Sequence, residues 1–276
     1  MKTSIAKLAL GLTLVSMSSV AMAGIATTKH NLGSTGNYNF TKATTEICVF
    51  CHTPHGADSS AAAPLWNRTL STATYQTYAS LGTSTFDAKD NQPGGVSLAC
   101  LSCHDGTQAM NTVINSPGSG TTRDVNMTKL GNKIVADGVA GTCIEAGIAS
   151  CGGFKEFNMM SQVAAEMIYL STDLRNDHPI SIQYAGAWGT HASYDANDDF
   201  FAALEATGPT NGPVYFLETG AAGSGKQKTD LPLYNGVDGA MVECATCHDP
   251  HTNTTTFLRH PSGNNGSATC LTCHDK

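Results

Sequence analysis

Four C-x-x-C-H units limit what this chain can fold into more than any other feature of its sequence. Two thiols about one helical turn apart can form thioethers to the two vinyl groups on one haem edge, and the histidine that follows them then reaches the iron. The pattern therefore predicts four covalently attached c-type haems. The attachment and proximal residues are Cys48, Cys51 and His52, then Cys100, Cys103 and His104, then Cys244, Cys247 and His248, and last Cys270, Cys273 and His274.

Zinc binding and disulfide exchange are the alternative uses of paired cysteines. Neither use requires a histidine directly after the second cysteine. The chain has 10 histidines in 276 residues, so chance would place one after all four pairs only about twice in a million. Haem attachment is the interpretation that explains the pattern.

The N-terminal segment has the features of a signal peptide. Lys2 and Lys7 precede an apolar run from Leu8 to Val20, and Ala21-Met22-Ala23 is a small-x-small cleavage site. A membrane anchor is the alternative, but the run is short for a membrane span and serines interrupt it. We expect residues 1–23 to be removed on export and residues 24–276 to form a single tetrahaem domain. No later segment is expected to span a membrane.

The charge of the chain argues against nucleic acid as a partner. Its net charge is −7, and removal of Lys2 and Lys7 with the signal peptide makes it −9. Haem propionates would add further negative charge, so we expect a docking partner to present positive charge or a metal surface. The composition is 41% hydrophobic and 13% charged, with 28 glycines, and few segments are periodic. The haems are therefore expected to supply much of the core.

Two cysteines lie outside the C-x-x-C-H pattern. Cys143 and Cys151 are separated by seven residues and neither is followed by histidine. We expect them to form a local disulfide, which would stabilise a loop-rich protein by roughly 2–3 kcal/mol. A redox role is the alternative.

The predicted fold is loop-dominated, with a few short helices, minimal strand and a core built largely from four haems. The haem units form two clusters, at residues 48–104 and 244–274, and we expect residues 105–243 to wrap the array. Helical spacing predicts a helix over Asn158–Leu170, and a second over Phe200–Ala206, after Asp199. A strand is predicted over Pro213–Glu218. Segments 117–124, 219–226 and 261–269 are expected to be loops.

Six further histidines are available for the distal sides of the four irons. His55 and His251 each follow a proximal histidine by three residues, so neither can easily reach the far side of that iron, and each would serve a neighbouring haem. We predict His30, His55, His178 and His251 as the distal ligands, with His178 assigned to the haem at Cys100 and Cys103. His191 and His260 are expected to be spare. Filling both axial sites suits an electron carrier better than an enzyme.

The chain resembles the multihaem c-type cytochromes of metal-respiring bacteria, and among these the tetrahaem outer-surface type that forms extracellular nanowires. About a fifth of the sequence carries the resemblance. The similar stretches are His30-Asn31-Leu32, Glu46 to Gly56, Cys100 to Gly106, Asn176 to Ser181, Cys244 to His251 and Ala268 to Lys276.

The resemblance implies a continuous chain of bis-histidine haems in a homopolymer, in which His55 binds a haem of the next subunit, the one at Cys244 and Cys247. It also implies upstream redox cytochromes and extracellular electron acceptors as partners, and a place outside the cell or on its surface. A soluble periplasmic shuttle and a multihaem reductase are the alternative functions. The reductase would need a catalytic pocket with acid and base groups, for which the sequence shows no constellation.

Overall fold

The computed structural model describes residues 24–33, 35–36, 44–82, 88–89, 91–108, 113–115, 169–185, 199–208, 213–236 and 238–275. Several predictions from the sequence lie outside these residues. They are the signal peptide, the Cys143–Cys151 disulfide, His191, the loop over 117–124 and all but the last two residues of the helix predicted over Asn158–Leu170.

The helices are short, and each haem unit begins in a helical turn. The longest helix described is α2, Gly95–His104, whose last turn holds the second unit. A helical turn suits the units because it brings residues three apart to one face, as the two thiols require. The other elements are α5 (Cys244–Cys247), α6 (Ala268–Leu271) and the 3-10 turns η1 (Ile25–Thr27), η2 (Cys48–Phe50), η3 (Tyr78–Leu81), η9 (Thr255–Phe257) and η10 (Asn265–Ser267).

The described strands form two small antiparallel sheets. One has the order β1 (Ile182–Gln183), β6 (Gly239–Val242), β5 (Tyr234–Gly236), and the other has the order β2 (Leu204–Thr207), β3 (Pro213–Leu217), β4 (Leu231–Pro232). Strand β3 confirms the prediction over Pro213–Glu218. The helix predicted over Phe200–Ala206 is wrong, because Leu204–Thr207 pairs with β3 instead. That pairing satisfies backbone groups along the segment and overrides its weak local preference.

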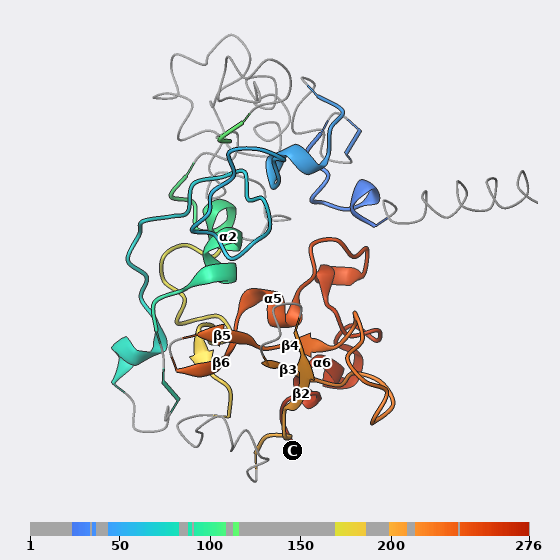
Figure 1. Ribbon diagram of the computed structural model, residues 1–276. Coiled ribbons are helices and arrows are strands. Elements are labelled where there is room, and N and C mark those ends of the chain that lie inside the picture. The colour runs from blue at the N-terminus through green and yellow to red at the C-terminus, as the bar shows by residue number, and fades with distance from the viewer. Residues whose placement is uncertain are drawn as a thin grey trace, which may run out of the picture.

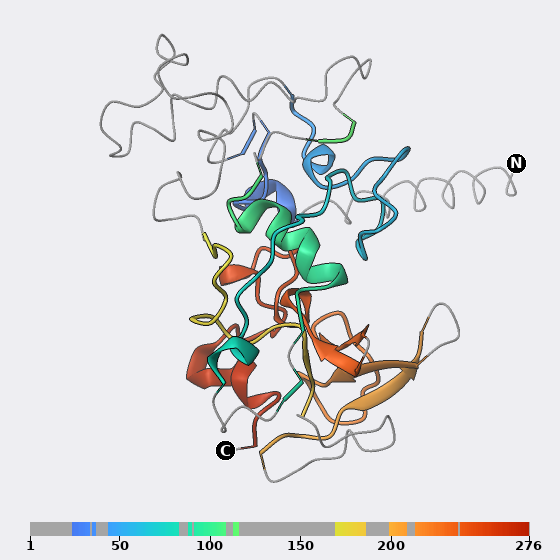
Figure 2. The ribbon, with the colours of Figure 1, turned by 90° about the vertical axis from the view of Figure 1, so that its left-hand side faces the viewer.

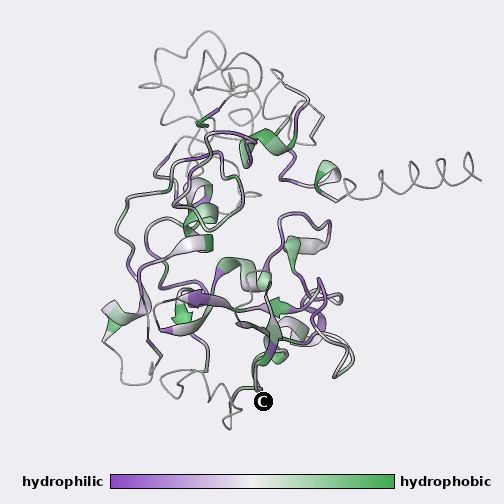
Figure 3. Cartoon of the chain, viewed as in Figure 1, coloured by the Kyte–Doolittle hydropathy of each residue, from purple (hydrophilic) through white to green (hydrophobic). Residues whose placement is uncertain are grey.

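The side-chain core is modest and lies mainly between the sheets. One cluster combines buried residues of both sheets, including Tyr184, Leu217, Leu231 and Val242, with Cys273 packed against it. A smaller cluster joins Tyr75, Leu101 of α2 and Leu174. Figure 3 shows the apolar residues in short stretches on helices and strands, separated by polar segments.

The two haem-unit clusters meet where α2 approaches α5. Figures 1 and 2 both show the blue N-terminal segments near α2 at one end of the molecule and residues 199–275 with both sheets at the other, while the teal segment that leads to η3 runs from the first end toward the second. The segment before β1 runs back between these parts, since Gln76 pairs with Asp173 in a parallel bridge. No helix among the described residues is long and apolar enough to cross a membrane.

Candidate functional site

The first, third and fourth haem units share one backbone arrangement. In each, a short segment that we call the bridging segment lies antiparallel to the proximal histidine: residues 65–67 beside His52, 257–259 beside His248, and 199–201 beside His274. The bridging segment donates a backbone N–H to the carbonyl of the second cysteine. The bonds are Asn67 N to Cys51 O (2.8 Å), Arg259 N to Cys247 O (2.8 Å) and Phe201 N to Cys273 O (3.0 Å).

A second backbone bond completes each arrangement on the other side of the histidine. The residue after the histidine donates its N–H to the first residue of the bridging segment, from Thr53 to Leu65 (2.8 Å), Asp249 to Phe257 (2.8 Å) and Asp275 to Asp199 (2.9 Å). The three proximal histidines are thus held by main-chain bonds on both sides. Such bonds fix the position of a ligand without depending on the side chains that supply them.

Left-handed residues turn two of the bridging segments so that a carbonyl faces the histidine ring. Leu65 has φ of 52° and Phe257 has φ of 59°, a conformation that costs a residue with a side chain roughly 1–2 kcal/mol. Directly before them, the carbonyl of Pro64 lies 2.7 Å from His52 Nδ1, and that of Thr256 lies 2.8 Å from His248 Nδ1. The unfavourable backbone is therefore used to orient the ring.

These carbonyls decide which ring nitrogen carries the proton. A carbonyl oxygen only accepts hydrogen bonds, so Nδ1 of His52 and of His248 must be the N–H, and Nε2 keeps a lone pair for a metal. A metal-bound histidine usually donates its other N–H in this way. His178 has the same state, because its Nδ1 lies 2.8 Å from the Pro179 carbonyl.

His260 is in the opposite state. Its Nδ1 accepts the backbone N–H of Ser262 at 3.1 Å, so the proton of the neutral ring sits on Nε2, where a ligand would need its lone pair. This geometry agrees with the expectation that His260 is spare.

His30 lies beside the proximal histidine of the second unit. Its ring centroid is 6.2 Å from that of His104, at an interplanar angle of 77°, and it stacks on Phe257 at 4.3 Å. Burial, with a smaller contribution from the nearby His104, lowers the pKa of His30 to about 4. The ring is therefore neutral, which is the form that binds iron. Its Nδ1 is buried without a hydrogen-bond partner among the described residues.

His52 and His251 form a second pair. Their ring centroids are 6.0 Å apart and their planes are nearly parallel, at 18°. An imidazole nitrogen binds a transition metal at about 2.0–2.1 Å and lies about 1.1 Å from its ring centre, so two rings on opposite sides of one iron have centroids about 6.2–6.4 Å apart. Both pairs match this separation closely, so each could hold one haem iron.

The attachment cysteines lie next to one another in chain order. Besides burial, the nearby Cys103 raises the pKa of Cys51, and the nearby Cys270 raises the pKa of Cys247. Cys100 is in hydrogen-bonding contact with Cys244. All eight are free thiols in the structure. Burial raises the pKa of Cys51 and of Cys273 to about 12, while the shared contact raises the pKa of Cys100 and lowers that of Cys244. The four units thus form one continuous series.

A buried carboxylate joins the second and third units. Glu243 directly precedes α5, and its side chain accepts hydrogen bonds from Ser97 Oγ of α2, from Ser181 Oγ at 2.9 Å and from the backbone N–H of Thr246. Ser97 Oγ also accepts the Cys244 N–H at 3.0 Å. Burial raises the pKa of Glu243, although both serine bonds act against the shift. Three distant segments are therefore fastened at one point.

Two buried polar residues fasten the first unit. The Asn67 side chain donates to the carbonyls of Val49 (2.6 Å) and Asn115 (2.8 Å), and accepts the Asn115 N–H at 2.9 Å. Arg68, 1% exposed, donates from Nη2 to the Ser102 carbonyl at 2.8 Å. Arg68 thus connects the chain after the first unit to α2.

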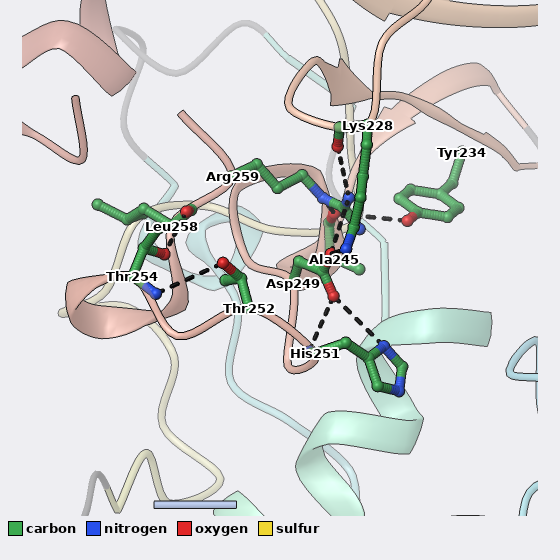
Figure 4. A network of polar contacts seen from close by, with 9 residues as sticks. All are labelled: Lys228, Tyr234, Ala245, Asp249, His251, Thr252, Thr254, Leu258 and Arg259. Carbon is green, nitrogen blue, oxygen red and sulfur yellow. Dashed lines mark hydrogen bonds and ion pairs between the residues drawn. The ribbon is translucent and has the colours of Figure 1, made fainter. Parts of the chain in front are cut away.

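Asp249 follows the third proximal histidine and makes a network with three basic side chains (Figure 4). Its Oδ1 lies 3.3 Å from His251 Nδ1, while its Oδ2 lies 3.8 Å from Arg259 and 3.9 Å from Lys228. The hydrogen bond to His251, with a smaller contribution from Arg259, lowers the pKa of Asp249 to about 2. His251 is thereby the one distal candidate whose described ring faces a carboxylate.

His55, in the equivalent place after the first unit, has no such arrangement. It is exposed, and Thr53, which stands where the third unit has Asp249, donates its hydroxyl to the His55 carbonyl at 3.0 Å. The Asn115 side chain donates to the same carbonyl at 2.6 Å. The backbone of His55 is thus held while its ring stays at the surface.

Comparison with known families supports this view of the cysteines. A family model described as the doubled CXXCH motif matches residues 237–276. The match supports a multihaem c-type cytochrome. Doubled motifs of this kind indicate covalent haem c and electron transfer, and the matched segment contains the third and fourth units with Glu243 and Asp249. No curated protein matches the chain.

Sequence reasoning missed the three bridging segments. Their sequences are Leu-Trp-Asn, Phe-Leu-Arg and Asp-Phe-Phe, which share no pattern, because the arrangement uses main-chain atoms. The left-handed Leu65 and Phe257 also carry no sequence signal, since glycine or asparagine is the usual residue in that conformation. A search for a short segment at a fixed spacing after each unit would fail as well, because the bridging segment of the fourth unit, residues 199–201, precedes that unit.

Proposed function

We propose that this chain transfers electrons through four bis-histidine c-type haems and serves as a subunit of an extracellular filament. The observation that carries the electron-transfer part is the pair of ring separations, 6.2 Å for His30–His104 and 6.0 Å for His52–His251. Haem c, when bound, supplies reversible one-electron chemistry at its iron. Two histidines on an iron leave no open position for a substrate, so the proposal is a carrier and not an enzyme.

The ring positions support the following axial assignments. His30, and not His178, takes the distal place opposite His104 at Cys100 and Cys103, which replaces the assignment made from the sequence. His251 takes the place opposite His52. His178 is left for His274, and its segment leads into β1, where Ile182 packs on the same cluster as Cys273.

The series of attachment cysteines supports a path in chain order. Cys100 and Cys244 are in hydrogen-bonding contact. In the other two pairs of adjacent units the cysteines are close enough for Cys103 to raise the pKa of Cys51 and for Cys270 to raise that of Cys247. The chain's contribution is to hold the four sites at fixed positions, through the bridging segments and the Glu243 contact. Electrons can then enter at one end of the series and leave at the other without a diffusing partner inside the subunit.

The filament part of the proposal rests on His55. With His30, His178 and His251 assigned, His248 needs a distal partner, and the exposed ring of His55 is available to a neighbouring subunit. The resemblance to outer-surface tetrahaem cytochromes supports the same bridge. We place the filament outside the cell, where it would receive electrons from other cytochromes and pass them to external acceptors.

Two experiments on the secreted protein test the proposal. Mass spectrometry should show four haems per chain, and electron paramagnetic resonance of the oxidised protein should show only low-spin iron. Three or fewer haems, or a full-occupancy high-spin signal, would overturn the electron-transfer part.

The filament part has its own test. His55→Ala should abolish filaments and leave one haem per subunit without a distal ligand, whereas His260→Ala, the matched control, should do neither. Filaments with four bis-histidine haems in His55→Ala would place the bridge elsewhere.

A further inference from the structure

The two H-x-P-H segments of the chain, His52–His55 and His248–His251, share their backbone bonds but differ in one residue that touches the second histidine. In both, the first histidine donates its N–H to the first cysteine, and the next residue donates to a bridging segment. That next residue is Thr53 in one and Asp249 in the other. The difference offers an internal comparison for what Asp249 does.

Asp249 holds His251 at two points. Its Oδ1 accepts the backbone N–H of His251 at 2.9 Å and faces the ring Nδ1 at 3.3 Å. Thr53 does neither for His55, because its hydroxyl donates to the His55 carbonyl. The side chain of Asp249 is only 10% exposed, whereas that of His251 is 57% exposed. A largely buried acid therefore orients a largely exposed ring.

Two cations lie near the other oxygen of the carboxylate. Arg259 Nη1 lies 3.8 Å and Lys228 Nζ 3.9 Å from Oδ2, the oxygen that His251 does not use. Arg259 is itself anchored, because its Nε donates to the Ala245 carbonyl at 2.8 Å and its backbone N–H to the Cys247 carbonyl. The third haem unit therefore positions Arg259, which lies beside the Asp249 carboxylate that faces His251 (Figure 4).

We propose that Asp249 is a positioning residue that sets both the orientation of His251 and the reduction potential of the iron that His251 binds. The inference rests on the proposed pairing of His251 with His52. A carboxylate that accepts Nδ1–H makes the imidazole a stronger donor than a backbone carbonyl does, and stronger donation favours the oxidised iron. Three of the other proposed ligands, His52, His178 and His248, face backbone carbonyls instead.

The consequence is a haem that is harder to reduce than its neighbours. Because Asp249 belongs to the third unit and the iron belongs to the first, one unit sets the potential of another. The residues that fold the third unit, Arg259 above all, thus also act on the first haem.

The test compares Asp249→Asn with Asp238→Asn in the complete holoprotein. Asp238 pairs with Lys89 and Asn91 on the surface and touches none of the described histidines, so it controls for the change of one charge. In Asp249→Asn, spectroelectrochemistry should show one haem of the four easier to reduce by about tenfold in its equilibrium constant, which is about 59 mV for one electron. The g values of one low-spin haem should shift as well.

Further variants separate the possible failures. Asp249→Glu should leave the reduction potential of that haem closer to the wild-type value than Asp249→Asn does, because it keeps a carboxylate. His251→Ala should give one high-spin haem. If it leaves four low-spin haems, the pairing is wrong and the inference fails with it. If His251→Ala behaves as expected but Asp249→Asn changes potentials and g values no more than Asp238→Asn does, the role of Asp249 alone is overturned.

Discussion

Glu243 should contribute strongly to stability, because it is buried and three segments depend on it. Replacing it with alanine removes the acceptor for Ser97 Oγ, Ser181 Oγ and the Thr246 N–H. A buried donor left unsatisfied costs about 1 kcal/mol or more, and loss of a helix cap costs about 1 kcal/mol. Glu243→Ala should therefore lower the free energy of unfolding by about 3 kcal/mol.

The assay is thermal unfolding of the holoprotein followed by circular dichroism. A loss of about 3 kcal/mol corresponds to a fall in Tm of roughly 6–12 °C for a domain of this size. Glu243→Gln keeps an acceptor oxygen and should lose about a third as much. A Glu243→Ala protein whose Tm lies within about 1 °C of the wild type would refute the reasoning.

The pH dependence of the stability difference between the wild type and Glu243→Gln gives an independent check. Burial raises the pKa of Glu243 in the folded protein above its ordinary value of 4.5, so the folded state binds the proton more tightly than the unfolded state. The stabilisation is complete below the unfolded pKa and is lost as the pH rises through the folded pKa. Glutamine does not titrate, so the stability advantage of the wild type over Glu243→Gln should shrink from pH 4 toward pH 8.

Three further predictions concern the first unit and the spare histidine. Asn67→Ala should cost about 2–3 kcal/mol in urea unfolding, because it strips the Val49 and Asn115 backbone groups of buried partners; a cost below about 0.5 kcal/mol would contradict this. Leu65→Gly should be more stable than Leu65→Ala by about 0.5–1 kcal/mol, since glycine adopts the left-handed backbone without the cost that a β-carbon brings; equal stability would mean that the strain is absent. His260→Ala should leave the low-spin spectrum of the oxidised protein unchanged, and any new high-spin haem would count against its tautomer.

The parts of the site that depend on covalent chemistry were predictable from the sequence, because the vinyl spacing of haem dictates where the cysteines and proximal histidines stand. The distal ligands stay a prediction, and the sequence offers them only as a set of candidates. Choosing among them needs ring positions, such as His30 beside His104, and carbonyl directions, such as Thr256 toward His248. These depend on loops whose course no local pattern encodes.

The fold divides in the same way. Strand β3 was predictable because Pro213–Leu217 is a short run of apolar residues that includes β-branched and aromatic side chains. The segment after Asp199 was not, because its conformation is set by partners far away: Leu204–Thr207 pairs with β3, and the Phe200 ring lies 4.6 Å from that of His274. Local helix preference loses to these long-range contacts.

The meeting of α2 with α5 has a consequence for how such a protein can change in length. About 140 residues separate the second and third haem units, yet Ser97, Ser181 and Glu243 bring the ends of that excursion together. Once a loop is closed, doubling its length costs only about 0.6 kcal/mol. Insertions and deletions between the two units can therefore accumulate through evolution, and new domains can be grafted there, while the spacing of the redox centres is preserved.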